Sequence, residues 1–91
     1  MDAFAALADP TRRRIVEMLA ERELAAGDIA RRFDMTAPAV SQHLKVLRAA
    51  ELVRVRNDAQ RRMYTLETRG LAGIDVWLTR YRHLWNEPVV N

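Results

Sequence analysis

Residues 40–47 read VSQHLKVL, and this stretch decides the fold. Val40, Leu44 and Leu47 recur at spacings of four and three, which places them on one side of an α-helix. This apolar stripe indicates that one face of the helix is buried. The other positions carry hydrogen-bonding side chains, namely Ser41, Gln42, His43 and Lys45. What this second face contacts is the question that the rest of the sequence has to answer.

The helix that contains this stretch is expected over residues 37–50. Thr36 can act as its N-cap, and Pro38 fits its first turn, where no backbone N–H is needed. A shorter helix is expected over 26–33, and the break at 34–36 is only three residues long. Two helices joined by such a short turn predict a helix-turn-helix, whose second helix enters a groove of DNA.

The face opposite the apolar stripe has the chemistry of a base-reading surface. The amide of Gln42 can donate to and accept from adenine, and Lys45 can reach a guanine or a phosphate. Residues 37–50 contain no acid, whereas a face that meets only water usually carries Glu–Lys pairs. We therefore expect DNA contacts from Ala37, Pro38, Ser41, Gln42 and Lys45, with Arg48 on the flank. His43 borders the stripe and is expected to be a packed boundary residue, the alternative being a phosphate or base contact.

A β-hairpin with basic arms is predicted directly after this helix, over residues 53–66. Apolar and basic residues alternate in the first arm, residues 57–60 have turn composition, and the second arm is again rich in β-favouring residues. Because the turn lacks glycine, a loop longer than two residues is expected. The arginines of the two arms are Arg54, Arg56, Arg61 and Arg62.

The charge of the chain is concentrated in the same region. Residues 36–66 hold six cations and two carboxylates, a net charge of +4, whereas the remainder holds nine arginines and ten carboxylates, a net charge of −1. This distribution is typical of a surface that faces phosphates, although a solvated basic surface would have the same composition.

A further helix is expected to start at Asp9-Pro10, with Asp9 as its cap and Pro10 in its first position. It begins with three consecutive arginines, Arg12, Arg13 and Arg14, at the end of the helix where the dipole disfavours cations. We expect them to form a solvated face whose positive charge is partly offset by Glu17 and Glu21. Phosphate contacts or a salt bridge between subunits are the alternatives.

The last helix is expected over residues 70–85, with Thr68 as its cap. Its apolar residues repeat at spacings of three and four and form a stripe that is broad for so small a domain. The stripe either closes over the domain's own core or meets a second subunit, and we expect subunit contact because exposed aromatic patches usually mark interfaces. Residues 87–91 are expected to be a frayed tail.

Several classes of function are excluded by composition. At 91 residues the chain is expected to be one domain, 1–91, that is mainly α with a small hairpin. No cysteine is present, which removes thiolate metal sites and cysteine nucleophiles. The apolar runs are too short for a membrane span, and the N-terminus lacks a signal peptide's basic start, so a cytoplasmic protein is expected. With two histidines, no glycine-rich phosphate loop and no acid pair, we expect no enzymatic activity.

Three strings together carry a resemblance to a known family: ALADPTRRRIVEMLA at residues 6–20, AVSQHLKVLRAAELVRVR at 39–56 and RRMYTL at 61–66. The chain resembles the winged helix-turn-helix repressors of the ArsR/SmtB family. The resemblance implies five helices, a two-stranded wing and a homodimer that binds an inverted-repeat operator in double-stranded DNA. It implies that the first and last helices pair the subunits, through Phe4, Leu7, Leu71, Ile74, Trp77, Leu78, Tyr81, Leu84 and Trp85.

Two departures from the family bear on regulation. Thiol-dependent metal sensors of the family have cysteines where residues 23–28 here read ELAAGD, and the last helix offers only Asp75, His83 and Glu87, without a second histidine. We therefore expect no regulatory metal and no cofactor, and the sequence does not identify a small-molecule inducer. The turn NDAQ also replaces the family's more frequent glycine-containing wing tip.

A different function remains open from the residues alone. A protein-interaction module could keep the winged fold and pair with another protein through its last helix. Such a module has no reason to keep the face of helix 37–50 free of acids, which favours a sequence-specific DNA-binding regulator.

Overall fold

Two capped helices open the chain. In the computed structural model, which describes residues 2–85, α1 (Ala3–Leu7) begins where Asp2 accepts a hydrogen bond from the backbone N–H of Ala5. Helix α2 (Pro10–Glu21) begins where the Asp9 carboxylate accepts from the N–H of Arg12 at 3.0 Å. Each carboxylate satisfies a donor that the first turn leaves free, and this confirms the cap predicted at Asp9.

Helices α3 (Ala26–Phe33) and α4 (Ala37–Ala49) form the predicted helix-turn-helix. Asp34 ends α3 in the left-handed region, with φ of 53°, and Thr36 Oγ1 caps α4 by accepting from Ala39 N at 3.3 Å. Glu51 ends α4, also in the left-handed region with φ of 60°, where glycine is the usual residue. Local hydrogen bonds therefore set both ends of α4, within one residue of the expected bounds.

The sheet has one strand more than expected. Strands β2 (Val53–Asp58) and β3 (Arg61–Leu66) form the predicted hairpin, and β1 (Leu24–Ala25) adds to the free edge of β3. All pairs are antiparallel and the strand order is β1-β3-β2. A strand of two residues shows no alternation, which is why the sequence did not reveal it.

The loop of the hairpin is shorter than predicted. Asp58 pairs with Arg61, so only Ala59 and Gln60 connect the strands, and the expectation of a longer loop was wrong. Ala59 takes the positive φ, 58°, that such a tight connection requires. The absence of glycine therefore did not prevent a two-residue loop.

One hydrophobic core joins α1–α4 to the inner face of the sheet. The stripe of α4, Val40, Leu44 and Leu47, is fully buried, and Ile15 and Ile29 reach the same core from α2 and α3. Each buried leucine or isoleucine contributes about 1.5–3 kcal/mol relative to an exposed one, so the core fixes which side of α4 remains outside.

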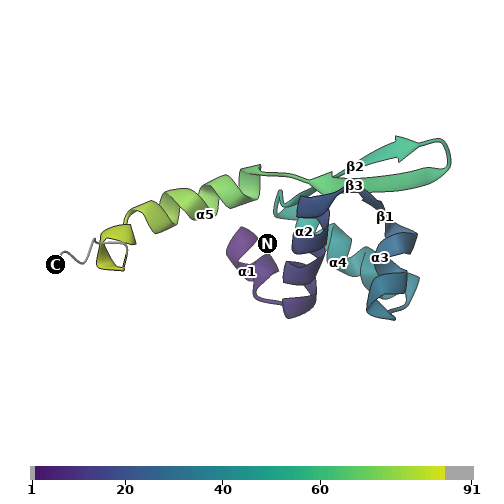
Figure 1. The fold of residues 1–91 in the computed structure, drawn as a ribbon, viewed down its shortest axis with the longest axis horizontal. Coiled ribbons are helices and arrows are strands. Elements are labelled where there is room, and N and C mark those ends of the chain that lie inside the picture. The colour runs from purple at the N-terminus through teal and green to yellow at the C-terminus, as the bar shows by residue number, and fades with distance from the viewer. Residues whose placement is uncertain (1, 86–91) are drawn as a thin grey trace.

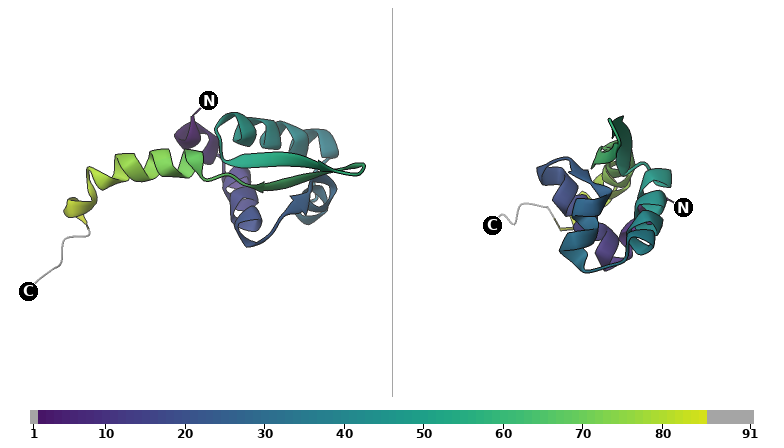
Figure 2. Two further views of the ribbon diagram at one scale, coloured as in Figure 1. Left: turned by 90° about the horizontal axis from the view of Figure 1, so that it is seen from above. Right: turned by 90° about the vertical axis from the view of Figure 1, so that its right-hand side faces the viewer.

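Helix α5 (Arg69–Thr79) projects from this body as an arm, shown at the left of Figure 1 and again in the left view of Figure 2. The radius of gyration is 15.5 Å, whereas a compact chain of this length has about 12 Å. Only the beginning of the arm is packed: Leu71 and Ile74 lie against the core, and Phe4 of α1 contacts Trp77.

The arm departs from the prediction at both ends. The expected helix over 70–85 stops at Thr79, and a 3-10 turn (Arg82–Leu84) follows, because Arg80 and Tyr81 bond to carbonyls three positions back. The Thr79 hydroxyl also donates to the carbonyl of Asp75, which draws the last turn out of regular geometry.

At its start, Thr68 occupies the cap position of α5 without a side-chain bond; the Glu67 carboxylate accepts from Arg69 N instead. The predicted tail at 87–91 lies outside the described residues. Among residues 2–85, no helix combines the length and the apolar character needed to cross a bilayer.

Candidate nucleic-acid interface

The outer face of α4 is open along its length. All six residues that the sequence assigned to DNA contact from this helix are exposed, namely Ala37, Pro38, Ser41, Gln42, Lys45 and Arg48. In the view from above in Figure 2, α4 lies at the margin of the body beside the hairpin, so nothing drawn there covers it. Burial of the stripe on the other side leaves this face as a rigid, polar surface.

A hollow of about 300 Å³ separates α4 from β3, and it concentrates positive charge. Its walls are formed by Ser41, Leu44, Lys45, Arg48, Arg62 and Tyr64. Three of these six side chains are cations and none is an acid. The hollow therefore has the charge and the donors that an oxygen-rich anion such as a phosphate needs.

The strand register divides the four arginines of the hairpin between two faces. Alternation puts Arg62 on the same face as Tyr64 and Val55, which is the face that meets α4. The guanidinium of Arg62 lies 6.0 Å from the centre of the Tyr64 ring. Arg54, Arg56 and Arg61 point to the opposite face of the hairpin.

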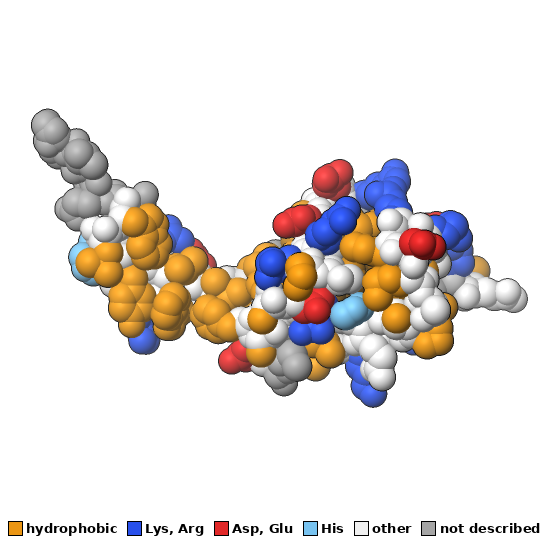
Figure 3. Space-filling model, turned by 90° about the horizontal axis from the view of Figure 1, so that it is seen from below, with side chains coloured by type: hydrophobic (Ala, Val, Ile, Leu, Met, Phe, Trp, Pro, Cys, Tyr) orange, Lys and Arg blue, Asp and Glu red, His pale blue; other side chains and the backbone are white. Residues whose placement is uncertain are grey.

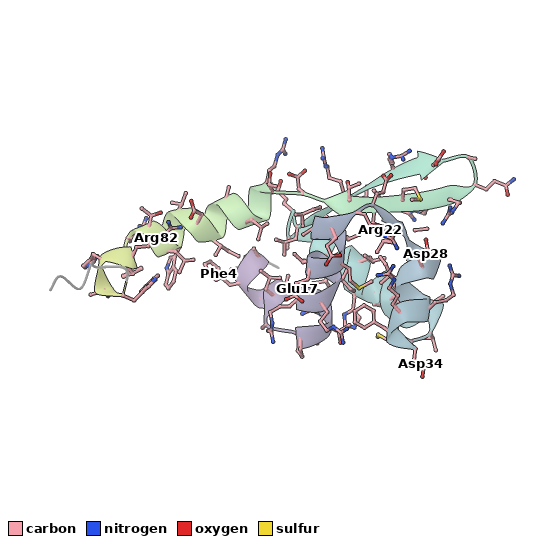
Figure 4. The ribbon with its side chains drawn as sticks, in the orientation of Figure 1. Phe4, Glu17, Arg22, Asp28, Asp34 and Arg82 are labelled. Atoms are coloured by element: carbon pink, nitrogen blue, oxygen red, sulfur yellow. The ribbon has the colours of Figure 1, made fainter. Side chains whose placement is uncertain are left out.

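We call this opposite face the outer face of the hairpin, and each of its three arginines is paired with a carboxylate. Arg56 donates twice to Glu23, at 2.7 Å each; Arg61 donates to Asp28 at 3.0 Å; and Arg54 lies 3.4 Å from Glu67. Figure 4 shows Asp28, labelled, at the start of α3 below the hairpin. To reach a phosphate these three arginines would first have to leave an ion pair, which Arg62 does not have among the described residues.

The pair Glu23–Arg56 also changes the proton affinity of both groups. The hydrogen bonds from Arg56 lower the pKa of Glu23 below its ordinary value of 4.5, and the charge of Arg56 acts in the same direction. The same hydrogen bonds raise the pKa of Arg56. Both shifts indicate a paired, ionised state at neutral pH that ties β1 to the hairpin.

The carboxylates that pair with the hairpin were missed in the sequence. Two of them, Glu23 and Asp28, lie 33 positions from their arginines along the chain. The third, Glu67, lies just beyond the hairpin, and no local sequence pattern links any of the three to its arginine. The only available signal was the nearly equal number of acids and cations outside residues 36–66.

A second hollow, of about 420 Å³, lies between β1, α3 and the hairpin. Arg22, Arg31, Arg32 and Arg61 line it, but so do Glu23 and Asp28. Its walls come from elements other than α4, and the two acids offset part of its charge. We therefore place the interface at the smaller hollow, which adjoins the acid-free helix.

The arginine run at the start of α2 is not a simple solvated face. Arg12 is half-buried and bonds to carbonyls of α1, Arg13 donates to the carbonyl of Leu7 at 2.7 Å, and the guanidinium of Arg14 lies 5.2 Å over the ring of Phe33. Within residues 2–85 neither Glu17 nor Glu21 forms an ion pair with the run.

His43 is half-buried at the edge of the core, in agreement with the expected boundary position. Its ring lies beside Arg12. On the arm, Asp75 binds Arg82, and Glu87 lies outside the described residues. In the part of the chain that the structure describes, no three His, Asp or Glu side chains are close enough to share a metal ion.

Comparison with known proteins identifies the family. The model of the bacterial regulatory proteins of the arsR family matches residues 9–55, which span α2 to the first hairpin strand. The chain belongs to the ArsR family. This confirms the resemblance drawn from the three sequence strings, and the winged helix-turn-helix fold with it.

Relatives and a solved structure described as regulators match most of the length of this chain. The chain is 52% identical over 79 residues to the HTH-type transcriptional regulator Rv2034 of Mycobacterium tuberculosis, covering 87% of this chain and 74% of that protein. It is 35% identical to the transcriptional repressor SdpR of Bacillus subtilis, over 88% and 89% of the two chains. A crystal structure described as a possible transcriptional regulator for arsenical resistance superposes with a TM-score of 0.81 at 36% identity, over 90% and 85%.

This ArsR-family chain is therefore a DNA-binding transcriptional regulator. The names of the family and of these relatives are those of transcriptional regulators.

Proposed function

We propose that this chain is a homodimeric repressor that binds an inverted-repeat operator, with α4 in the major groove and the hairpin along the backbone or in the minor groove. One observation carries the proposal: an acid-free, exposed helix face is continuous with a hollow lined by three cations. The proposal treats residues 1–91 as a single DNA-binding domain.

The contacts divide into two kinds. Gln42 and Ser41 are proposed to read base edges, while Ala37 and Pro38 approach the backbone or a thymine methyl group. Lys45, Arg48 and Arg62 are proposed to hold phosphates at the hollow. The three arginines of the outer face of the hairpin are also proposed to contact phosphates, namely Arg54, Arg56 and Arg61. Each should contribute less to DNA affinity than Arg62, because each has a carboxylate partner.

The uncovered arm supports the homodimer. Figure 3 shows hydrophobic side chains gathered along it, and exposed aromatics include Trp77 at 46%, Trp85 at 59% and, on α1, Phe4 at 47%. Regulators of this family generally act as dimers. We propose that the same face of a second copy covers the arm, through the nine residues that the resemblance implied, Phe4, Leu7, Leu71, Ile74, Trp77, Leu78, Tyr81, Leu84 and Trp85.

Repression follows from occupancy: a dimer bound at a promoter would exclude RNA polymerase. SdpR, which the chain resembles over nearly its whole length, is named a transcriptional repressor. The proposed site of action is the cytoplasm, where a bacterial operator is found.

The decisive experiment selects bound sequences from a random DNA pool and then measures affinity for the selected duplex and for a scrambled one by fluorescence anisotropy. We expect an inverted repeat and a steep loss of affinity with salt. Gln42→Ala should lower the preference for the selected sequence by about 5- to 100-fold, the equivalent of one bidentate base contact, while binding to scrambled DNA stays the same.

Lys45→Ala is the matched comparison, because it should weaken binding to both duplexes about equally. Selection that yields no inverted repeat, or an affinity that does not respond to salt, would contradict the proposal.

A further inference from the structure

The arginine run of α2 is a feature that the proposed DNA interface leaves unused. Three cations at the positive end of a helix dipole weaken that helix, so their presence calls for another reason. In the structure each of the three contacts a different neighbour: Arg12 reaches α1 and α4, Arg13 reaches the end of α1, and Arg14 lies over Phe33 of α3.

Arg12 is the member of the run that joins two helices. Its Nε donates to the carbonyl of Ala6 at 2.7 Å, and Nη2 donates to that of Ala5 at 3.4 Å. Its Nη1 lies 3.4 Å from Nδ1 of His43. A single, half-buried guanidinium thus links the end of α1, which carries Phe4, to the middle of α4.

The contact between Arg12 and His43 depends on the state of the ring. Arginine has only donors, so this contact is a hydrogen bond when Nδ1 accepts, with the ring neutral and its hydrogen on Nε2. Once the ring gains a second proton, both nitrogens become donors. The hydrogen bond is then lost, and two cations face each other across the gap between α2 and α4.

The charged groups around the ring come from α2. They are Arg12 and Asp9, and the pKa of Asp9 is lowered mainly by the N–H of Arg12 and also by the charge of Arg12. Helices α1 and α3 and strand β2 also pack on α4, yet no hydrogen bond or ion pair within residues 2–85 brings a charged group of theirs to the ring. On α4 itself the residues one turn away are apolar: Ala39, Val40, Val46 and Leu47. Asp9 offsets only part of the repulsion, because it already caps α2 through Arg12 N.

We propose that Arg12 and His43 are positioning residues that fix α4 relative to α1, and that protonation of His43 releases α4 and lowers the discrimination between operator and other DNA. The inference rests on the proposed function, because it treats α1 as part of the dimer face and α4 as the reading helix. Besides the general attraction of DNA by added positive charge, acidification would change the geometry in which α4 reads the bases.

The test compares two affinities at two pH values. The dissociation constants for the selected operator and for scrambled DNA are measured at about pH 8 and about pH 5.5, which lie on either side of the ordinary pKa of a histidine side chain, at constant ionic strength. The general gain in DNA affinity from added positive charge cancels in their ratio. For the wild-type protein we expect this ratio to fall about tenfold at the lower pH, as for the loss of one charge-assisted hydrogen bond.

Two histidine variants isolate the group responsible. Asn Oδ1 lies close to the position of His Nδ1 and does not titrate, so His43→Asn should keep a high ratio at both pH values. The chain has one other histidine, His83, on the arm. His83→Asn should therefore reproduce the pH response of the wild type.

Two arginine variants test the link between the helices. Arg12→Met should lower the ratio about tenfold at pH 8 and remove its response to pH. Arg13→Met is the matched control, because Arg13 also donates to carbonyls at the end of α1, at 2.7 and 3.2 Å, and has no bond to α4 among the described residues. Arg13→Met should show the same ratio and the same response to pH as the wild type. Circular dichroism checks that each variant is folded. If Arg12→Met does not fold, the result for His43→Asn decides whether the inference holds.

The outcomes separate the two proposals. A wild-type protein that does not discriminate at pH 8 overturns the proposed function and this inference with it. A protein that discriminates equally at both pH values overturns this inference alone, as does a response to pH that persists in His43→Asn or disappears in His83→Asn.

Discussion

At the scale of single residues, Gly70 shows how closely the arm joins the body. A Cβ added there would lie 2.5 Å from the carbonyl oxygen of Ala50 and 3.0 Å from that of Glu51, and both atoms are backbone. The N–H of Gly70 donates to the same Glu51 carbonyl at 2.9 Å. Only a residue without a side chain permits this approach of α5 to the end of α4.

Gly70→Ala is therefore expected to lower the free energy of unfolding by about 1–3 kcal/mol, because backbone atoms must shift to admit the methyl group. Gly73→Ala is the control: its Cβ would meet nothing within 4 Å, and alanine in a helix is worth about 0.5–1 kcal/mol more than glycine. Urea denaturation at a fixed protein concentration measures both. Equal effects of the two substitutions would refute the close approach.

At the scale of elements, the ion pairs of the hairpin explain its attachment to the helix-turn-helix. Glu23 precedes β1 and Asp28 lies in α3, and both bind arginines of β2 and β3 that are 33 positions away. These carboxylates hold the outer face of the hairpin, while Arg62 on the inner face stays beside α4. We propose that the outer face mainly attaches the hairpin and that the inner face mainly contacts DNA.

The attachment is expected to weaken in acid. In the folded protein, Arg56 lowers the pKa of Glu23 below its ordinary value of 4.5. The ion pair therefore stabilises the fold fully at pH values above the pKa of Glu23 in the unfolded chain, and this stabilisation is lost as the pH falls through the lower pKa of the folded protein. Glu23→Gln should thus be less stable than the wild type at pH 7, and the difference should shrink below pH 4.5. Urea denaturation across this range measures it, with Glu21→Gln as the control, because this variant removes an exposed carboxylate of α2 that has no ion pair within residues 2–85.

The division of the arginines predicts unequal effects on DNA binding. Arg62→Ala should reduce the slope of log affinity against log salt by about one, since one phosphate contact disappears. Arg56→Ala removes the same charge from the same hairpin but from the paired outer face, so its slope should change by less than half as much. Anisotropy titrations at several salt concentrations give both slopes, and a larger change for Arg56→Ala would reverse the assignment.

At the scale of the whole molecule, the protruding arm is the feature that most supports the proposed homodimer. The rings of Trp77 and Tyr81 contact each other at a tilt of 49°, with centres 4.9 Å apart, and Phe4 meets Trp77 edge to face, yet all three remain more than one third exposed. Aromatic surface on this scale is stable in water when a partner covers it. A second copy, related by twofold symmetry, would cover two arms at once.

Trp77→Asp should convert the protein to a monomer and lower operator affinity by at least about 100-fold, because the two half-sites are then bound independently. Val76→Asp is the matched control: Val76 is 62% exposed and lies about 100° around the helix from Trp77, away from the stripe. Sedimentation velocity reports the assembly state of each. A dimer that survives Trp77→Asp, or is lost only in Val76→Asp, would place the interface elsewhere.

The sequence by itself determined the helices, the helix-turn-helix, the hairpin and the family. Caps, prolines and apolar spacing act within a few residues, so Thr36, Pro38 and the stripe of α4 could be interpreted without coordinates. The polar face of VSQHLKVL followed from the same periodicity, because a buried stripe leaves only one side of a helix free.

Only the tertiary structure decided which arginines are available and what they hold. The pair Arg12–His43 is 31 positions apart and the pair Arg56–Glu23 is 33 apart, so neither spacing reflects a repeat of helix or strand. The early end of α5 and the strand β1 were likewise set by contacts that no local pattern encodes. Charge in a sequence shows how many cations a surface can have, whereas packing decides which of them remain free to meet a phosphate.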